Sequence, residues 1–160
     1  MESVLFQILT GVINYCMKKL YFVCMGNYYR SRLAEELAYY YAAQYGVDIL
    51  ADSGGLSKIP NPDHVGPMAH ATLRYLANKN ITPKGIEREP KSCIVEDVYN
   101  ADIVVLTDGA EQGALFRQRF PDFTGDIVAW NARDHMYDPI LQTTARIDQK
   151  VEELIKSLHK

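Results

Sequence analysis

The sequence predicts a single α/β domain in which a four-stranded parallel sheet has helices on both faces. Short β-rich runs alternate along the chain with segments whose apolar residues recur at helical spacing, a pattern typical of parallel strands joined by helices. The 160 residues fit one domain that can bury a core of its own. With 48% apolar and 23% charged residues, the composition is ordinary for a globular protein.

Two strands and two helices are predicted in the first half of the chain. Residues 19–23 (KLYFV) suit a buried strand, and residues 47–51 suit a second one. Residues 31–46 carry apolar side chains at helical spacing and end at a glycine, a common helix terminator. Residues 52–62 are rich in Gly, Pro and Asn and predict turns, and residues 67–79 predict a second helix.

The second half of the chain continues this alternation. Residues 102–106 (DIVVL) are the clearest strand, because consecutive branched residues between turn signals are typical of a strand covered on both faces. Residues 126–130 predict the fourth strand. Helices are predicted over residues 94–100, 108–120 and 139–158. In such a sheet the loop after the first strand lies where ligands bind, at the carboxyl ends of the strands.

Residues 1–16 differ from the rest of the chain. Their apolar run is too short to span a bilayer, the lysines follow it rather than precede it, and no signal-cleavage site appears. Met17 resembles a natural start that leads directly into the first strand. We therefore expect an N-terminal extension of uncertain role over residues 1–16, one domain over residues 17–160, and no membrane partner.

The net charge and the cysteine content argue against several classes of function. The net charge of −3 and the pI near 5.8 leave no basic footprint for nucleic acid. The three cysteines, Cys16, Cys24 and Cys93, are too few and too irregularly spaced for a disulfide framework, and they fit a reducing, cytoplasmic location. No Cys-x-x-Cys pair occurs and the four histidines are scattered, so we expect no metal site.

The segment from Cys24 to Ser31 (CMGNYYRS) has the chemistry of an anion-binding loop. It lies between the first predicted strand and the first predicted helix, so backbone N–H groups and the helix dipole converge on one point. Arg30 adds a planar guanidinium that clamps two phosphate oxygens. The residues expected to bind phosphate are Met25, Gly26, Asn27, Tyr28, Tyr29 and Arg30.

The same loop supplies a candidate nucleophile. Positive potential at a helix N-terminus lowers the pKa of a cysteine, so we expect Cys24 to attack phosphorus at neutral pH without a histidine base. Ser31 offers a hydroxyl that steadies the thiolate or assists its departure. Asn27 tolerates the left-handed backbone angles of a tight turn.

These motifs resemble the signature of a known family. V-C-M-G-N-Y-Y-R-S is similar to the V-C-x-G-N-x-C-R-S loop of low-molecular-weight protein tyrosine phosphatases, in particular bacterial-type members with a G-N-Y-Y-R-S loop, and the resemblance covers most of residues 17–160. It implies the three-layer, flavodoxin-like fold of phosphotyrosine phosphatase I. It also implies cofactor-free hydrolysis of a phosphorylated protein or a small phosphomonoester through a phosphocysteine on Cys24. Tyr29 departs from the family, because most members have a second cysteine there.

The resemblance also assigns two residues that support the loop. Residues 52–54 (DSG) are similar to the family's D-S-A/G turn, whose serine supports the loop asparagine, and this role passes to Ser53. Residues 105–108 (VLTD) are similar to the family's strand that ends in M-D. By this similarity Asp108 would pair with and orient Arg30.

Two aspartates compete for the role of general acid, which the family places in a late Asp-Pro loop. Asp138 is followed by a proline, but an aspartate before a proline is also a common way to begin a helix. Asp134 follows the fourth predicted strand in W-N-A-R-D, a spacing similar to that of the acid-bearing loop in some shorter bacterial members. We favour Asp134 and keep Asp138 as the alternative.

Two other functions fit the same loop. Arsenate reductases share the fold, but the thioredoxin-coupled kind needs two further cysteines close together, and only Cys93 lies downstream of the loop. A route that uses a small-molecule thiol stays open. The other alternative is a catalytically weak, phosphate-binding regulatory module. The sequence names neither the physiological substrate nor the oligomeric state.

Overall fold

A computed structural model describes residues 17–159, and the expected extension over residues 1–16 lies outside the described residues. Each predicted strand and helix has a counterpart in the structure, with shifted ends. The elements are β1 (Lys18–Cys24), α2 (Arg30–Tyr45), β2 (Ile49–Gly55), α3 (His70–Asn78), α4 (Val95–Tyr99), β3 (Ile103–Leu106), α5 (Gly109–Arg119), β4 (Asp126–Ala129) and α6 (Ile140–Leu158).

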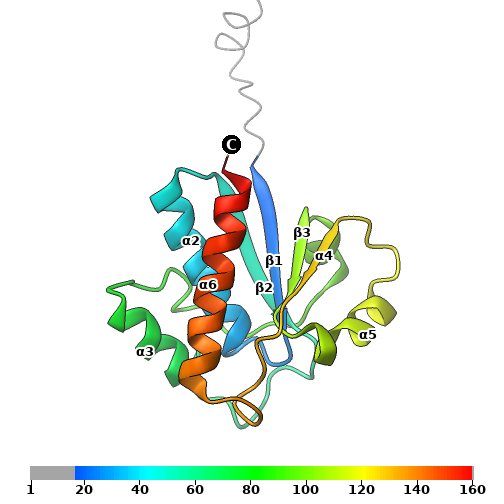
Figure 1. Cartoon of the computed structure of the whole chain (residues 1–160). Helices are drawn as coiled ribbons and strands as arrows, with labels where there is room; N and C mark the ends of the chain where they lie inside the picture. Colours follow the sequence, from blue (N-terminus) through cyan, green and yellow to red (C-terminus); the bar gives the residue numbers. More distant parts are fainter. Residues whose placement is uncertain (1–16, 160) are drawn as a thin grey trace, which may run out of the picture.

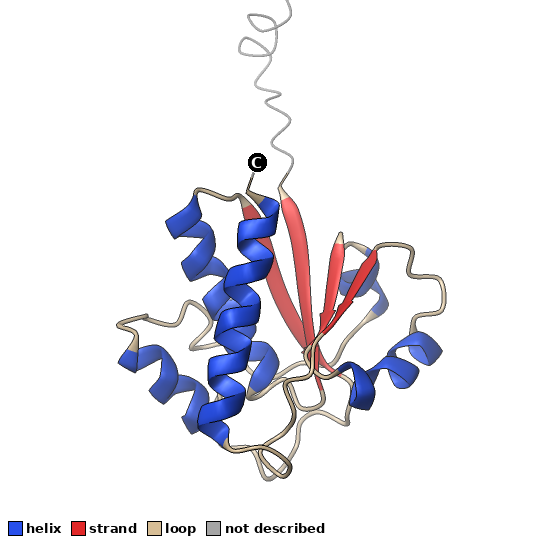
Figure 2. Ribbon diagram, viewed as in Figure 1, coloured by secondary structure: helices blue, strands red, loops and turns tan. Residues whose placement is uncertain are grey.

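The strands form one parallel sheet in the order β2-β1-β3-β4, which confirms the predicted fold class (Figure 1, Figure 2). Helices α2, α3 and α6 lie on one face of the sheet, and α4 and α5 lie on the other (Figure 1). The chain goes from β1 to β2 on one side and then to β3 on the other, so the strand order reverses at β1. Within residues 17–159, no helix is long and apolar enough to cross a membrane.

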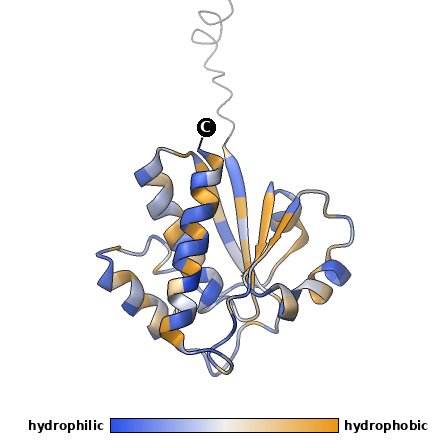
Figure 3. Ribbon diagram, in the orientation of Figure 1, coloured by the Kyte–Doolittle hydropathy of each residue, from blue (hydrophilic) through white to orange (hydrophobic). Residues whose placement is uncertain are grey.

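Strand β1 is buried on both faces because it supplies side chains to two separate cores. Leu20 and Phe22 pack on the side of α2 and α6, whereas Tyr21 and Val23 pack on the other side against Phe116 of α5. A strand covered in this way needs a continuous apolar run rather than an alternating one. In Figure 3, β3 is coloured as hydrophobic, whereas hydrophilic and hydrophobic bands alternate along α6.

Strand β2 extends beyond its predicted end at residue 51. Residues 52–54, which the sequence predicts as a turn, continue the parallel pairing, with Phe22 opposite Ser53 and Val23 opposite Gly54. A Cβ atom on Gly54 would lie 2.1 Å from the hydroxyl oxygen of Tyr21. The glycine therefore leaves room for the Tyr21 hydroxyl, and pairing with β1 overrides the local turn propensity.

The end of α2 is set by a local residue, whereas a long-range hydrogen bond lies at the start of α3. Helix α2 ends at Gly46, which has the left-handed φ of 63° expected of a terminating glycine. Helix α3 begins at His70 rather than at the predicted residue 67. Its preceding residue, Ala69, is extended and donates its backbone N–H to the carbonyl oxygen of Tyr28 at 2.7 Å.

Candidate active site

The loop that follows Cys24 leaves the carboxyl end of β1, in the interior of the sheet, and enters the N-terminus of α2 (Figure 1). Asn27 has a φ of 49°, the left-handed conformation predicted for this turn. Gly26 packs against His64 so closely that a Cβ atom would lie 2.7 Å from the imidazole Cε1. The loop therefore brings backbone N–H groups and the positive end of α2 together beside Cys24.

Ser31 links the Cys24 sulfur to the side chain of Asn27. The Ser31 Oγ lies 2.9 Å from the Cys24 Sγ and accepts a hydrogen bond of 2.9 Å from the Asn27 Nδ2. Because the hydroxyl oxygen accepts from Asn27, its own proton is available to the sulfur. This arrangement stabilises a thiolate, which accepts hydrogen bonds but donates none.

Arg30 is almost fully buried, with 2% of its surface exposed, and its guanidinium is anchored on two sides. One nitrogen, Nη1, donates to the carbonyl oxygen of Ala132 at 3.0 Å. The other, Nη2, lies 2.9 Å from the Glu111 Oε1 and 3.8 Å from the Asp134 Oδ2. Burial by itself lowers the pKa of Arg30, but the negative charges of Cys24, Glu111 and Asp134 outweigh burial and raise it.

The predicted pairing of Asp108 with Arg30 is wrong, because Glu111 takes that place. Asp108 is the residue before the first turn of α5, and its backbone N–H donates to the Gln112 Oε1. Glu111 lies in the first turn of α5 and reaches the guanidinium instead. An acidic residue in a first turn is common, so the sequence contains no distinctive signal for this contact.

Asn27 is held by further hydrogen bonds besides the one to Ser31. Its Nδ2 donates to the Ser53 Oγ at 2.9 Å, which is the contact that the family resemblance implied. Its Oδ1 accepts hydrogen bonds from the Arg88 Nη1 at 3.2 Å and from the Lys91 backbone N–H at 3.0 Å. Arg88 donates in turn to Glu35 and Ser53, both at 2.8 Å.

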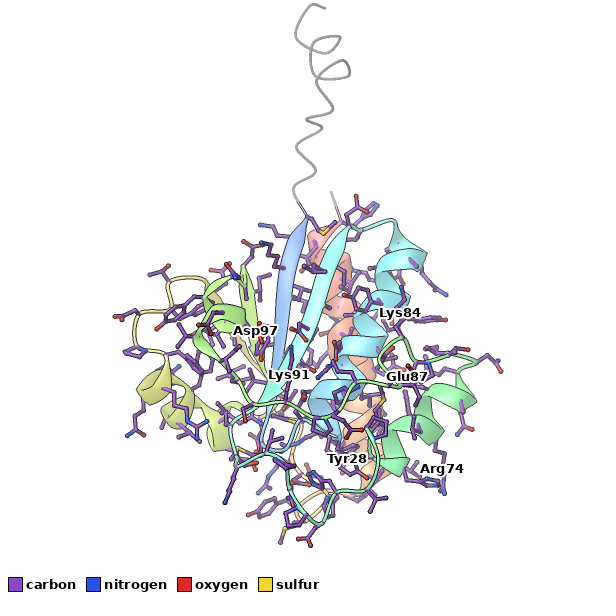
Figure 4. All side chains as sticks on the ribbon, turned by 180° about the vertical axis from the view of Figure 1, so that it is seen from behind. Tyr28, Arg74, Lys84, Glu87, Lys91 and Asp97 are labelled. Carbon is purple, nitrogen blue, oxygen red and sulfur yellow. The ribbon has the colours of Figure 1, made fainter. Side chains whose placement is uncertain are left out.

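Arg88 and Lys91 were not predicted as site residues. They lie in the irregular segment between α3 and α4, which follows the outer edge of the sheet near β2 (Figure 4). An irregular segment has no hydrophobic period from which its path can be predicted. Only the folded chain shows that this segment supports the loop asparagine.

A cavity of about 260 Å³ opens above the loop. It contains the predicted nucleophile, the predicted phosphate-binding arginine and one of the two candidate acids. Its lining residues are Cys24, Met25, Gly26, Tyr28, Tyr29, Arg30, His64, Ala69, Ala71, Asp134, His135 and Ile140. Within residues 17–159, no group of three His, Cys, Asp or Glu side chains is arranged to hold a metal ion.

The two candidate acids have different surroundings. Asp134 lines the cavity, and its Oδ1 accepts a hydrogen bond of 2.6 Å from the backbone N–H of His135. Asp138 does not line the cavity, and its Oδ2 lies 3.5 Å from the Arg146 Nη1. Nor does Asp138 cap α6 as its sequence context suggests, because the residue before the first turn is Pro139.

The family model described as low molecular weight phosphotyrosine protein phosphatase matches residues 19–160. The chain belongs to this family. It is accordingly a hydrolase of the phosphatase type that acts on phosphoesters. No curated protein sequence matches the chain.

Solved structures of phosphatases share the fold of this family member. The YwlE mutant from Bacillus subtilis is 21% identical, with a TM-score of 0.75 over 89% of this chain and 99% of the other. The low molecular weight protein tyrosine phosphatase from T. tengcongensis is 21% identical, with a TM-score of 0.73 over 88% and 99%. The Drosophila arginine phosphatase DARP is 18% identical, with a TM-score of 0.69 over 90% and 99%.

Two tyrosines of the loop contact residues at the walls of the cavity. Tyr28 stacks on His64 with ring centroids 4.0 Å apart and donates its hydroxyl to the Val65 carbonyl oxygen at 2.7 Å. Tyr29 donates to the carbonyl oxygen of Ile140 at 3.4 Å, and burial raises its pKa to about 12. Both tyrosines therefore connect the loop to the walls of the cavity.

Proposed function

We propose that the protein hydrolyses phosphomonoesters of the phosphotyrosine type through a phosphocysteine on Cys24. The thiolate sulfur bonds to phosphorus as the bond from phosphorus to the leaving oxygen breaks, and protonated Asp134 gives its proton to that oxygen. The Asp134 carboxylate then takes a proton from water, which attacks phosphorus and breaks the sulfur–phosphorus bond. Phosphate leaves, and the thiolate is restored.

The observation that carries the proposal is the meeting of Cys24, Arg30 and Asp134 at one cavity. The buried guanidinium and the loop N–H groups are suited to stabilise the charge that develops on the phosphoryl oxygens, and in a site of low dielectric such interactions are strong. The Ser31 hydroxyl beside the sulfur favours the thiolate both as nucleophile and as leaving group.

A related protein supports the covalent step. A mutant of the arginine phosphatase YwlE carries a phosphorylated serine in its active site, which is the oxygen counterpart of a phosphocysteine. For the present protein we favour an aromatic leaving group, because Tyr28 and His64 form a stacked wall of the cavity. We further infer a cytoplasmic enzyme whose substrate is a phosphorylated protein or a small phosphomonoester.

Hydrolysis of p-nitrophenyl phosphate by wild type and Cys24→Ser tests the proposal. We expect the substitution to lower kcat by about a thousandfold or more, because an unactivated hydroxyl replaces the thiolate. Rapid acid quenching and intact-mass measurement should reveal a phosphorylated wild-type enzyme during turnover. Unchanged hydrolysis by Cys24→Ser would exclude Cys24 as the nucleophile.

Cys93→Ser is the matched control. Cys93 is 8% exposed, and burial raises its pKa to about 12, so it is a neutral thiol at physiological pH. Its replacement should leave hydrolysis nearly unchanged. Arsenate-dependent consumption of a small thiol without phosphatase turnover would instead favour arsenate reduction, and phosphate binding without turnover of either substrate would favour a regulatory module.

A further inference from the structure

A second cavity adjoins the catalytic one. It has a volume of about 380 Å³ and lies between α3 and the start of α6. The two cavities share Ala71 and Ile140 in their walls, so the second begins where the first ends. A group bound beside Cys24 is therefore continuous with a surface formed by both helices.

The second cavity has an unbalanced positive charge. Arg74, which is exposed, is the charged residue that lines it, and no Asp or Glu is among its lining residues. Within residues 17–159, none of the ion pairs between basic and acidic side chains includes Arg74. Figure 4 places Arg74 on α3 at the edge of the molecule, away from the Lys91 segment. The charge of this cavity is complementary to a carboxylate.

Exposed apolar side chains follow Asp134 along the chain. Met136 is 78% exposed, Tyr137 62%, Ile140 44% and Leu141 81%. Ile140 and Leu141 line the second cavity. A small phosphomonoester fills only the first cavity and leaves these side chains in water, whereas a polypeptide that extends from a phosphorylated side chain covers them.

We propose that the second cavity binds the polypeptide next to the phosphorylated residue of a protein substrate, with an acidic side chain on Arg74 and an apolar side chain on Leu141. This inference rests on the proposed function, because it presupposes that phosphate is bound beside Cys24. It deepens that function by naming the substrate as a phosphoprotein whose target residue has acidic and apolar neighbours.

Peptide substrates with a charge reversal test the inference. Two phosphotyrosine peptides with the same apolar residues, one with glutamates and one with lysines on both sides of the phosphotyrosine, are hydrolysed by wild type, Arg74→Glu and Arg117→Glu. Arg117 lies exposed on α5, on the far face of the sheet, so its reversal changes the net charge equally at a distance from the site. Hydrolysis of p-nitrophenyl phosphate reports whether the catalytic site of each variant is intact.

We expect wild type and Arg117→Glu to prefer the glutamate peptide. In Arg74→Glu, kcat/KM for the glutamate peptide should fall by about three- to tenfold, in line with one solvent-exposed ion pair replaced by a repulsive pair. In the same variant, kcat/KM for the lysine peptide should rise by a similar factor, and activity on p-nitrophenyl phosphate should be unchanged. Leu141→Asp should weaken hydrolysis of both peptides without affecting the small substrate.

Three results would overturn the inference. One is the same preference between the two peptides in Arg74→Glu and wild type. Another is turnover of p-nitrophenyl phosphate without measurable turnover of either peptide, which leaves the proposed function intact. The third is a dimer in sedimentation experiments that Leu141→Asp dissociates, because the surface would then bind a second copy of the chain. If the wild-type protein hydrolysed neither peptide nor p-nitrophenyl phosphate, that result would instead count against the proposed function.

Discussion

Asp134 and Asp138 lie in one short loop between β4 and α6, and their different contacts suit them to different tasks. The Asp134 carboxylate lines the cavity and lies 3.8 Å from the Arg30 guanidinium, whereas that of Asp138 is directed to Arg146 on α6. A general acid must reach the leaving oxygen, so position rather than the following proline should select the residue.

The acid is tested with leaving groups of different quality. We expect Asp134→Asn to lower kcat for phenyl phosphate by about 10²–10⁴-fold, the usual contribution of a positioned acid, and to affect p-nitrophenyl phosphate less because that leaving group needs no proton. Asp138→Asn is the matched control and should change either rate little. A larger loss in Asp138→Asn than in Asp134→Asn would reverse the assignment.

Glu111 acts on phosphate binding through Arg30. Its carboxylate accepts a hydrogen bond from the Arg30 Nη2 at 2.9 Å, and its side chain is 27% exposed. We expect Glu111→Gln to lower kcat/KM for p-nitrophenyl phosphate by about tenfold, because a hydrogen bond between charged groups that orients the guanidinium becomes a weaker one. Glu96→Gln, in the first turn of α4, is the control at another exposed helix start. Equal kcat/KM values in both variants would show that the charge of Glu111 is not needed to orient Arg30.

At the scale of elements, the last part of β2 includes a glycine that is packed closely against a side chain of β1. Gly54 lies opposite Val23 and beneath the Tyr21 hydroxyl, with no space for a Cβ atom. We expect Gly54→Ala to reduce the free energy of unfolding by about 1–3 kcal/mol, the usual cost of overpacking, as measured by urea denaturation.

Gly113→Ala provides the comparison for Gly54→Ala. Gly113 lies within α5, where an added Cβ atom meets the end of the flexible Arg117 side chain. Alanine is favoured over glycine in a helix by about 1 kcal/mol, so this variant should be as stable as wild type or more stable. A Gly54→Ala protein of wild-type stability would mean that Tyr21 moves aside at little cost.

At the scale of the whole molecule, Asp148 joins three helices that cover one face of the sheet. Its carboxylate on α6 accepts hydrogen bonds from Tyr41 of α2, from Tyr75 of α3 and from Lys79, the residue that follows α3. Burial by itself raises the pKa of Asp148, but the three hydrogen bonds outweigh burial and hold the pKa below its ordinary value near 3.8.

Because the pKa of Asp148 is lowered in the folded chain, the contribution of Asp148 to the free energy of unfolding depends on pH. The unfolded chain binds the proton at higher pH than the folded chain, so the contribution is complete above about pH 4 and is lost as the pH falls through the folded-state pKa. We expect Asp148→Asn to reduce the free energy of unfolding at pH 7 by about 1–3 kcal/mol. The difference from wild type should shrink in acid. Asp122→Asn, at an exposed position, should show neither effect.

Much of the fold was predictable because its signals are local. The run KLYFV predicts a buried strand, and the structure confirms this by placing its alternate side chains in two cores. The predicted end of α2 at Gly46 agrees with its left-handed backbone. The turn predicted over residues 52–54 was wrong because pairing with β1 is a long-range interaction that local composition does not report.

The sequence by itself determined the order of elements, the parallel sheet and the loop that starts at Cys24, because hydrophobic period and residue chemistry are properties of neighbouring positions. Only the tertiary structure decided that Glu111 rather than Asp108 contacts Arg30, that Arg88 holds Asn27, and that Arg74 flanks a second cavity. Some of these arrangements join segments that are far apart in the chain. Others depend on which side chain of a helix faces the site. Spacing along a sequence does not determine long-range contacts or the direction in which a helical side chain faces, because both are set when the helices pack on the sheet.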